Sequence, residues 1–392
     1  MAVVGAQVSV SSTATTPLAA TGAFDLAATY YVCNIGAAKM LVDPDDIATL
    51  LEAHEVAQSA GDAYEATRAL VNIAYTAMYS GRHAAGMDYA RRVVSYALEH
   101  EVHNLSSYGA IMIAWLQLRA GEWDEAEGLA RGELTNTAGI LQLAARTVLT
   151  ELAVRRGDAD AADLLADLDS RAALAGELQR ILPVVELSVE YALTRGDRIP
   201  SERVRQLVAD YPLCTGVNGW RMRIAAWATV AGVETDFDVA DDGPFAAMAR
   251  GDWGIAASRF GAIGWTYDQA LTLSMLDDED SLVDALDIAR RLGAEPLVKH
   301  VARRLRDLGI RVPLGQRDAT RSNPAGLTAR QLEVLRLVAA GLTNTEIAER
   351  LVVSKRTAEH HVAAVLTKLG VTSRRAAARR AVELGLEPAP DR

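Results

Sequence analysis

A glycine recurs at nearly even intervals between stretches of helical sequence. Gly81, Gly121, Gly157 and Gly196 are 40, 36 and 39 residues apart, and Gly251 follows in the same Arg-Gly-Asp context as two of them. A turn at a fixed interval between helices is typical of α-helical hairpins that bury their apolar faces against one another. The spacing therefore predicts a helical-repeat sensor or interaction domain, to which we assign residues 41–310.

The repeats can be aligned with one another. A shift of 40 residues places Ala74 on Ala114, Tyr75 on Trp115 and Gly81 on Gly121. This pattern resembles tetratricopeptide-like repeats, although the interval exceeds that family's repeat of about 34 residues and its full Trp, Leu, Gly and Tyr pattern is missing. The alternative is an irregular helical bundle whose helices end in glycine.

Composition supports an all-α fold. Of the 392 residues 50% are hydrophobic, Ala and Leu dominate, and β-branched runs are few. The two cysteines form no motif, no apolar run of about 18 residues occurs, and the N-terminus lacks the early positive charge of a secretory signal. We therefore predict a cytoplasmic protein that does not contact a membrane.

The charge is divided between the two ends of the sequence. The overall net charge is −11, but residues 290–392 contain 20 Lys/Arg and 10 Asp/Glu, which leaves −21 for residues 1–289. An acidic body joined to a basic end suggests that the end binds a polyanion. The alternative is a solvated basic face without a partner.

Three boundaries follow from local composition. Residues 1–40 are rich in Ser, Thr and Ala and are assigned to a loose N-terminal tail. Residues 311–326, RVPLGQRDATRSNPAG, contain two prolines and two glycines and are assigned to a linker. The remaining residues 327–386 form the C-terminal domain.

Four short helices are expected in that domain. Thr328 with Gln331, and Thr343 with Glu346, form two capping boxes at the starts of the first and second helices. Ser354 caps a third helix that ends at Gly370, and Ser373 caps a fourth that runs to Leu384. Two helices joined by a tight turn, the second basic at its start, predict a helix-turn-helix.

The third helix has two different faces. Its apolar positions recur with helical spacing and should face the domain core: Ala358, Val362, Val365, Leu366 and Leu369. The opposite face should enter the major groove of DNA, where Arg can read guanine, Glu cytosine and Ala a thymine methyl group; it comprises Lys355, Arg356, Glu359, His360, Ala363 and Thr367. The expected phosphate contacts are Thr343, Asn344, Lys368, Arg374 and Arg375.

These residues resemble the LuxR-type helix-turn-helix transcription regulators over about 327–386. The matching positions include Glu333-Val334-Leu335, Gly341-Leu342-Thr343-Asn344, Glu346-Ile347-Ala348, Arg356-Thr357, His361-Val362 and Lys368-Leu369-Gly370-Val371. Gln331 and Ala358 depart from the family's usual Glu and Val. The resemblance implies that the fourth helix mediates a homodimer; alternatively, Ala377, Ala381 and Leu384 only pack on the first helix.

Three stretches before the C-terminal domain resemble, more weakly, the region just before this domain in the large ATP-binding LuxR-type regulators: Gly251-Asp252-Trp253, Gly264–Leu271 and Ala319–Pro324. Those proteins carry a P-loop ATPase, but no Gly-x4-Gly-Lys-Ser/Thr motif occurs in these 392 residues. No Gly-x-Ser-x-Gly, HExxH or Cys/His cluster occurs either, and His360 and His361 point too far apart to share a metal. We expect no enzyme activity, no catalytic residue, no cofactor and no metal.

The sequence thus supports two functions. The first is a sequence-specific transcription regulator whose helical repeats sense a partner or ligand and whose C-terminal domain binds double-stranded DNA as a dimer. RNA polymerase, another protein and a small-molecule effector stay open as further partners. The second is a helical-repeat interaction scaffold that does not bind DNA. The six tryptophans would form either repeat core or a ligand groove.

Overall fold

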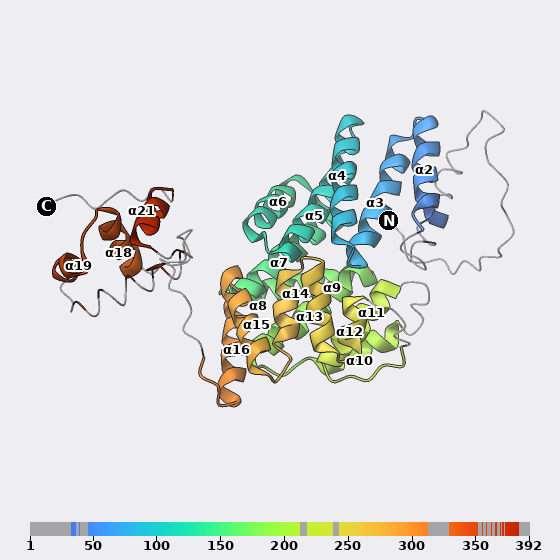
Figure 1. Ribbon diagram of the computed structural model, residues 1–392. Coiled ribbons are helices and arrows are strands. Elements are labelled where there is room, and N and C mark those ends of the chain that lie inside the picture. Colours follow the sequence, from blue (N-terminus) through green and yellow to red (C-terminus); the bar gives the residue numbers. More distant parts are fainter. Residues whose placement is uncertain are drawn as a thin grey trace. The chain divides into compact units, whose positions relative to one another are not determined.

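The computed structural model describes residues 33–36, 39, 46–211, 218–237, 243–312, 329–351, 355, 358, 362, 365, 366, 369, 371 and 373–383. All regular secondary structure in these ranges is helical, which confirms the predicted all-α class (Figure 1). The chain divides into two compact units, Met1–Val312 and Pro313–Arg392. Apart from Arg311 and Val312, the predicted linker lies outside the described residues.

The first half of unit 1 is a series of helical hairpins. Helices α3, α5, α7 and α9 form an inner layer in which each contacts the next, while α4, α6 and α8 pack between them on the outside (Figure 1). The helices are α2 (Ala48–Ser59), α3 (Ala63–Tyr79), α4 (His83–Glu99), α5 (His103–Ala120), α6 (Trp123–Asn136), α7 (Gly139–Arg156), α8 (Ala161–Ala175) and α9 (Leu178–Arg195). The likeness of these hairpins to tetratricopeptide repeats stays a prediction.

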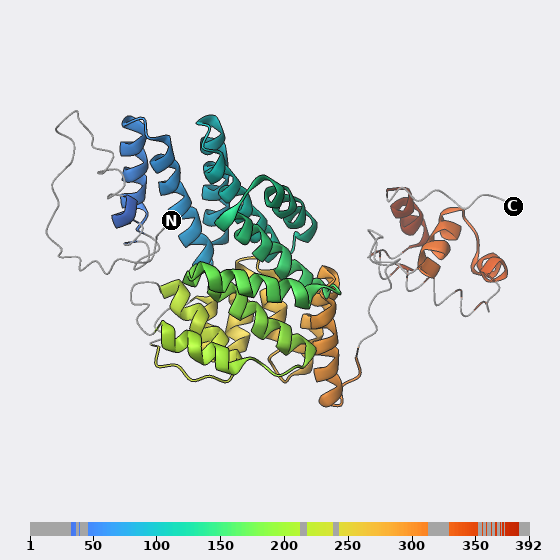
Figure 2. The same cartoon turned by 180° about the vertical axis from the view of Figure 1, so that it is seen from behind.

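The second half of unit 1 does not extend this series outward. Helix α14 packs on α5, and α16 packs on both α7 and α9, so the chain returns to the inner layer (Figure 2). The helices of this half are α10 (Ser201–Asp210), α11 (Asn218–Val230), α12 (Pro244–Ala249), α13 (Trp253–Ala262), α14 (Thr266–Leu273), α15 (Glu279–Leu292) and α16 (Glu295–Asp307).

The recurring glycines end the helices as predicted. Each has a positive φ: 74° at Gly81, 90° at Gly121, 83° at Gly157, 79° at Gly196 and 75° at Gly251. Glycine is favoured there because it adopts the left-handed conformation without a steric penalty from Cβ. The predicted turns are therefore confirmed.

Four of these glycines have a second role that the sequence did not reveal. A Cβ on Gly121 would lie 2.7 Å from Leu292 Cδ2, and a Cβ on Gly157 would lie 3.0 Å from the Pro296 ring. Gly81 faces Ile263 and Pro244 at ordinary contact distances of 3.5 Å and 3.8 Å, and Gly196 faces the flexible guanidinium end of Arg303. We call this line of contacts, between Gly81, Gly121, Gly157 and Gly196 and the returning helices α12–α16, the glycine seam.

Backbone capping adds polar contacts along the glycine seam. Thr266 Oγ1 donates a hydrogen bond to the carbonyl of Ala120, at 3.1 Å, and Arg303 Nη1 donates one to the carbonyl of Arg195, at 3.2 Å. The last carbonyls of a helix have no partner within the helix, so side chains from the returning helices supply donors to α5 and α9.

Replacing Gly157 by alanine is expected to destabilise unit 1 by about 2–3 kcal/mol. About 1–2 kcal/mol comes from the left-handed backbone, and the contact with the rigid Pro296 ring adds to it. Gly176→Ala is the matched control, because Gly176 also ends a helix at φ 69° but has nothing within 4 Å of its Cβ position. Urea unfolding measures the stability of both variants. An equal loss of unfolding free energy in Gly157→Ala and Gly176→Ala would contradict the steric role of the glycine seam.

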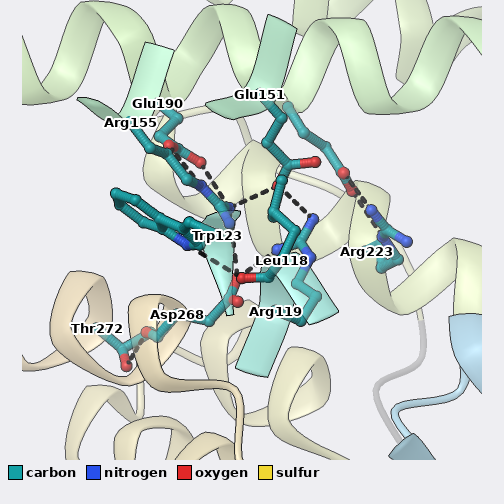
Figure 3. A network of polar contacts seen from close by, with 10 residues as sticks. Leu118, Arg119, Trp123, Glu151, Arg155, Glu190, Arg223, Asp268 and Thr272 are labelled. Carbon is teal, nitrogen blue, oxygen red and sulfur yellow. Dashed lines mark hydrogen bonds and ion pairs between the residues drawn. The ribbon is translucent and has the colours of Figure 1, made fainter. Parts of the chain in front are cut away.

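A buried ionic network joins the two halves (Figure 3). Arg119 on α5 contacts Glu151 on α7 at 2.9 Å and Asp268 on α14 at 2.6 Å. Arg155 on α7 contacts Glu151 at 2.7 Å and Glu190 on α9 at 3.1 Å. All five side chains are buried, and buried charges are tolerated only when they are paired. The network therefore fixes how α14 sits on the inner layer.

Arg223 on α11 forms a separate buried pair with Glu186 on α9. Its Nε donates to Glu186 Oε1 at 2.8 Å, and its Nη2 donates to the other carboxylate oxygen. The guanidinium also lies over the rings of Tyr79 and Phe245, at 4.7 Å and 5.2 Å from their centroids. Arginine suits such a site because its planar group can bond a carboxylate and stack on aromatic faces together.

The tryptophans belong mainly to the hydrophobic core. Trp115, Trp123, Trp220 and Trp265 are buried in the main apolar cluster together with Trp227, and Trp253 packs against it. Trp115 stacks on Tyr79 and meets Trp265 edge to face, with centroids 5.9 Å and 5.4 Å apart. These contacts favour the repeat-core interpretation of the tryptophans over a ligand groove.

Part of the segment assigned to the N-terminal tail is ordered. Residues 33–36 are helical, and Cys33 is buried against Leu50, Ala53 and Ile73. Burial raises the pKa of the Cys33 thiol to about 11, which disfavours the nucleophilic thiolate at neutral pH. Cys214 lies outside the described residues. Among the helices described, none is long and apolar enough to cross a membrane.

Candidate nucleic-acid interface

Unit 2 contains helices α18 (Ala329–Ala339), α19 (Asn344–Leu351) and α21 (Arg374–Glu383). Between α19 and α21, residues 355, 358, 362, 365 and 366 are helical. One hydrophobic core joins all four segments and includes Val334, Leu335, Ile347, Leu351, Ala358, Val362, Val365, Ala377 and Ala381. The predicted order of helices is thus present in the described residues.

The turn between α18 and α19 has the predicted capping chemistry. Gly341 has a φ of 84°, and Thr343 and Glu346 form a reciprocal capping box. The Thr343 amide donates to Glu346 Oε2 at 2.6 Å, and the Glu346 amide donates to Thr343 Oγ1 at 3.3 Å. Hydrogen bonds from Thr343 lower the pKa of the Glu346 carboxyl group. A phosphate contact by Thr343 stays a prediction, and it would compete with this carboxylate.

Two further residues predicted to bind phosphate contact each other. Arg374 Nη1 donates to Asn344 Oδ1 at 2.6 Å, and Arg374 Nη2 donates to the carbonyl of Leu342. Partial burial lowers the pKa of Arg374. Arg374 therefore ties the start of α21 to the start of α19, whereas its neighbour Arg375 is exposed. Phosphate binding by Asn344, Arg374 and Arg375 stays a prediction.

Comparing Arg374→Met with Arg375→Met should show whether Arg374 stabilises unit 2. Unit 2 contains no Trp, Tyr or Phe to report on unfolding, so hydrogen exchange of its peptides is the suitable measurement. Loss of the Arg374 bonds should cost about 1.5–3 kcal/mol and speed exchange in α19 and α21 about tenfold or more. Arg375→Met should leave exchange unchanged. Equal protection in the two variants would contradict a structural role for Arg374.

The predicted apolar face of the third helix is confirmed. Ala358, Val362 and Val365 are buried, and Leu366 and Leu369 are partly buried against the same core. Lys355, at the start of this helix, is exposed. The other residues predicted for the groove face and the adjoining phosphate contact lie outside the described residues and stay predictions: Arg356, Glu359, His360, Ala363, Thr367 and Lys368.

Helix α21 packs within its own unit. Ala377 and Ala381 have no exposed surface, and α21 contacts α18, as the non-dimer interpretation of these residues expects. Leu384 lies outside the described residues. Among the side chains described on α21, those of Arg375, Arg379 and Arg380 are exposed.

Four short helices around one core, with a capped turn before the second and an exposed lysine at the start of the third, define a helix-turn-helix protein. Residues 325–381 match the luxR family of bacterial regulatory proteins. The chain belongs to this LuxR family.

Relatives with curated names are similar to different parts of the chain. HTH-type transcriptional regulators of Mycobacterium bovis and Mycobacterium tuberculosis are 25% identical over 381 residues, covering 85% of this chain and 41% of the relative. The oxygen regulatory protein NreC of Staphylococcus aureus is 31% identical over 148 residues, covering 33% of this chain and 68% of the relative. The chain thus spans about two fifths of the length of the mycobacterial relatives.

Proposed function

We propose that this chain is a sequence-specific DNA-binding transcription regulator. The observation that carries the proposal is the match of residues 325–381 to the LuxR family, over four helical segments that share one core. The names of the mycobacterial relatives, HTH-type transcriptional regulators, support the same function. Residues 327–386 would be the DNA-binding domain, and the helical unit would sense a partner protein or a small molecule.

The proposed mode of binding places the third helix in the major groove. Lys355 and Arg356 would contact base edges or phosphates at the helix start, and Glu359, His360, Ala363 and Thr367 would follow along the groove. A homodimer would read two half-sites about 34 Å apart, one turn of the duplex. Phosphate contacts fix the position of the protein, whereas base contacts supply the sequence preference.

Selection from random duplex DNA tests the proposal. The purified full-length chain should enrich one sequence, and a dyad-symmetric sequence would further support a dimer. The Lys355→Ala/Arg356→Ala variant is the control and should lose the enrichment. If the full-length chain enriches no sequence and its DNA affinity does not depend on salt, the interaction scaffold becomes the better interpretation.

A further inference from the structure

Half of the basic excess at the C-terminal end lies outside the helix-turn-helix unit. Residues 313–392 contain 13 Lys/Arg and 8 Asp/Glu, a net of +5 over 80 residues. Residues 290–312 contain 7 Lys/Arg and 2 Asp/Glu, also a net of +5, but over only 23 residues. These 23 residues belong to unit 1, whose preceding 289 residues carry a net of −21. The last 23 residues of an otherwise acidic unit are thus strongly basic.

The geometry of α16 separates its basic residues by role. Leu297, Val301 and Leu305 are buried, and Arg303 bonds the end of α9 at the glycine seam. Lys299 and Arg306 are seven residues apart, so they share the side of the helix opposite the buried face. Both are exposed, as is Arg311 just after the helix. We call Lys299, Arg306 and Arg311 the α16 basic surface.

The α16 basic surface differs from those exposed arginines of unit 1 that a neighbouring carboxylate neutralises. Arg131, Arg171 and Arg205 each bond a carboxylate one helical turn away, at 2.7 Å. Among the described residues, by contrast, Lys299 and Arg311 make no ion pair, and Arg306 only donates from Nε to a backbone carbonyl. Cations near the C-terminus of a helix are stabilised by the helix dipole. This effect does not explain Lys299, which lies in the middle of α16, or Arg311, which lies beyond its end.

We propose that the α16 basic surface binds backbone phosphates of the duplex beside the sequence read by the helix-turn-helix. The inference rests on the proposed DNA-binding function. Unpaired, exposed cations on an acidic unit fit a polyanion, and the duplex is the polyanion that the neighbouring unit would hold. The 16 residues 313–328, which join the two units, can span at most about 55 Å, or about one and a half turns of DNA. The α16 basic surface is therefore tethered within reach of the flanking DNA, which raises its local concentration there.

Phosphate contacts have a specific signature in salt dependence. Each phosphate that a lysine or arginine neutralises releases condensed counterions and adds about 0.9 to the slope of log K against log salt concentration. Three contacts should therefore add about 2–3 to this slope for each bound protomer, without changing which sequence is preferred. Base contacts, in contrast, set the preferred sequence.

The test compares three forms of the full-length chain on a duplex of about 60 base pairs that carries the selected sequence at its centre. In Lys299→Ala/Arg306→Ala/Arg311→Ala the slope should fall by about 2–3 for each bound protomer, with the preferred sequence unchanged. The matched control is Arg91→Ala/Arg92→Ala/Arg198→Ala, which removes three exposed cations elsewhere in unit 1. The control should keep the wild-type slope, although it lowers the net charge by the same amount.

A second measurement shortens the duplex instead of changing the protein. When the duplex is cut back to the selected sequence alone, the wild-type slope should fall to that of the α16 variant. Equal slopes for wild type and α16 variant on the long duplex overturn this inference and leave the proposed function standing. A change in sedimentation with an unchanged DNA slope also overturns it, since the surface then binds another copy of the chain. Wild-type protein that binds no sequence selectively refutes the proposed function, and this inference with it.

Discussion

Arg155→Met should destabilise unit 1 by about 3–5 kcal/mol. Arg155 is 1% exposed, and its loss leaves the buried carboxylates of Glu151 and Glu190 with fewer partners. Removing one partner of a buried ion pair costs much more than losing a surface pair, because the remaining charge stays desolvated. All six tryptophans lie between residues 115 and 265, so urea unfolding followed by tryptophan fluorescence reports on unit 1 alone.

The loss should depend on pH in a defined direction. Burial already raises the pKa of Glu190, and Arg155 opposes this shift. Without Arg155, folding would favour the protonated carboxyl group more strongly. A group whose pKa is higher in the folded state gives up stability as pH rises, so the variant should lose more at pH 8 than at pH 5.

Two comparisons isolate the cause of this loss. Arg205→Met removes an exposed arginine that pairs with Glu202 and should change stability by no more than about 0.5 kcal/mol. Arg223→Met alone should be costly, whereas Arg223→Met/Glu186→Met should recover most of the loss, since no buried charge is then left unpaired. A double variant as unstable as Arg223→Met would mean that lost packing, not unpaired charge, dominates.

Arg356→Ala should have the largest effect on DNA recognition. If Arg356 bonds a base, the substitution should cost about 1–3 kcal/mol on the selected sequence and relax the preference at one base position. Competition binding against duplexes changed at each position measures both effects. Lys368→Ala is the comparison: as a phosphate contact it should weaken binding to all sequences equally and lower the salt slope by about 1. An equal loss of affinity for all sequences in Arg356→Ala would mean that this arginine also contacts the phosphate backbone of DNA.

Local signals in the sequence were sufficient to predict the turns and caps. The glycine that ends a helix, and the Thr343 and Glu346 side chains that open one, act within a few residues of their partners. The buried side of the third helix follows from helical spacing alone, so Ala358, Val362 and Val365 could be assigned to the core.

Contacts between distant segments could not be read in the same way. Arg119 and Asp268 are 149 residues apart, and no spacing rule connects them. Arg374 and Asn344 were both predicted to bind phosphate because each is polar and near a helix end, but the fold lets them bond each other. A buried ionic network also runs against the expectation that charged residues are exposed, so composition gives no indication of it.

The glycine seam also limits how the repeat array can change in length. In an open array each hairpin touches only its neighbours, so one unit can be added or removed without disturbing the rest. Here Gly121, Gly157 and Gly196 each meet a different position along α15 and α16. Deleting one hairpin would shift every later turn against those helices by one step. The contacts with α15 and α16 thus restrict the number of hairpins that the unit can contain.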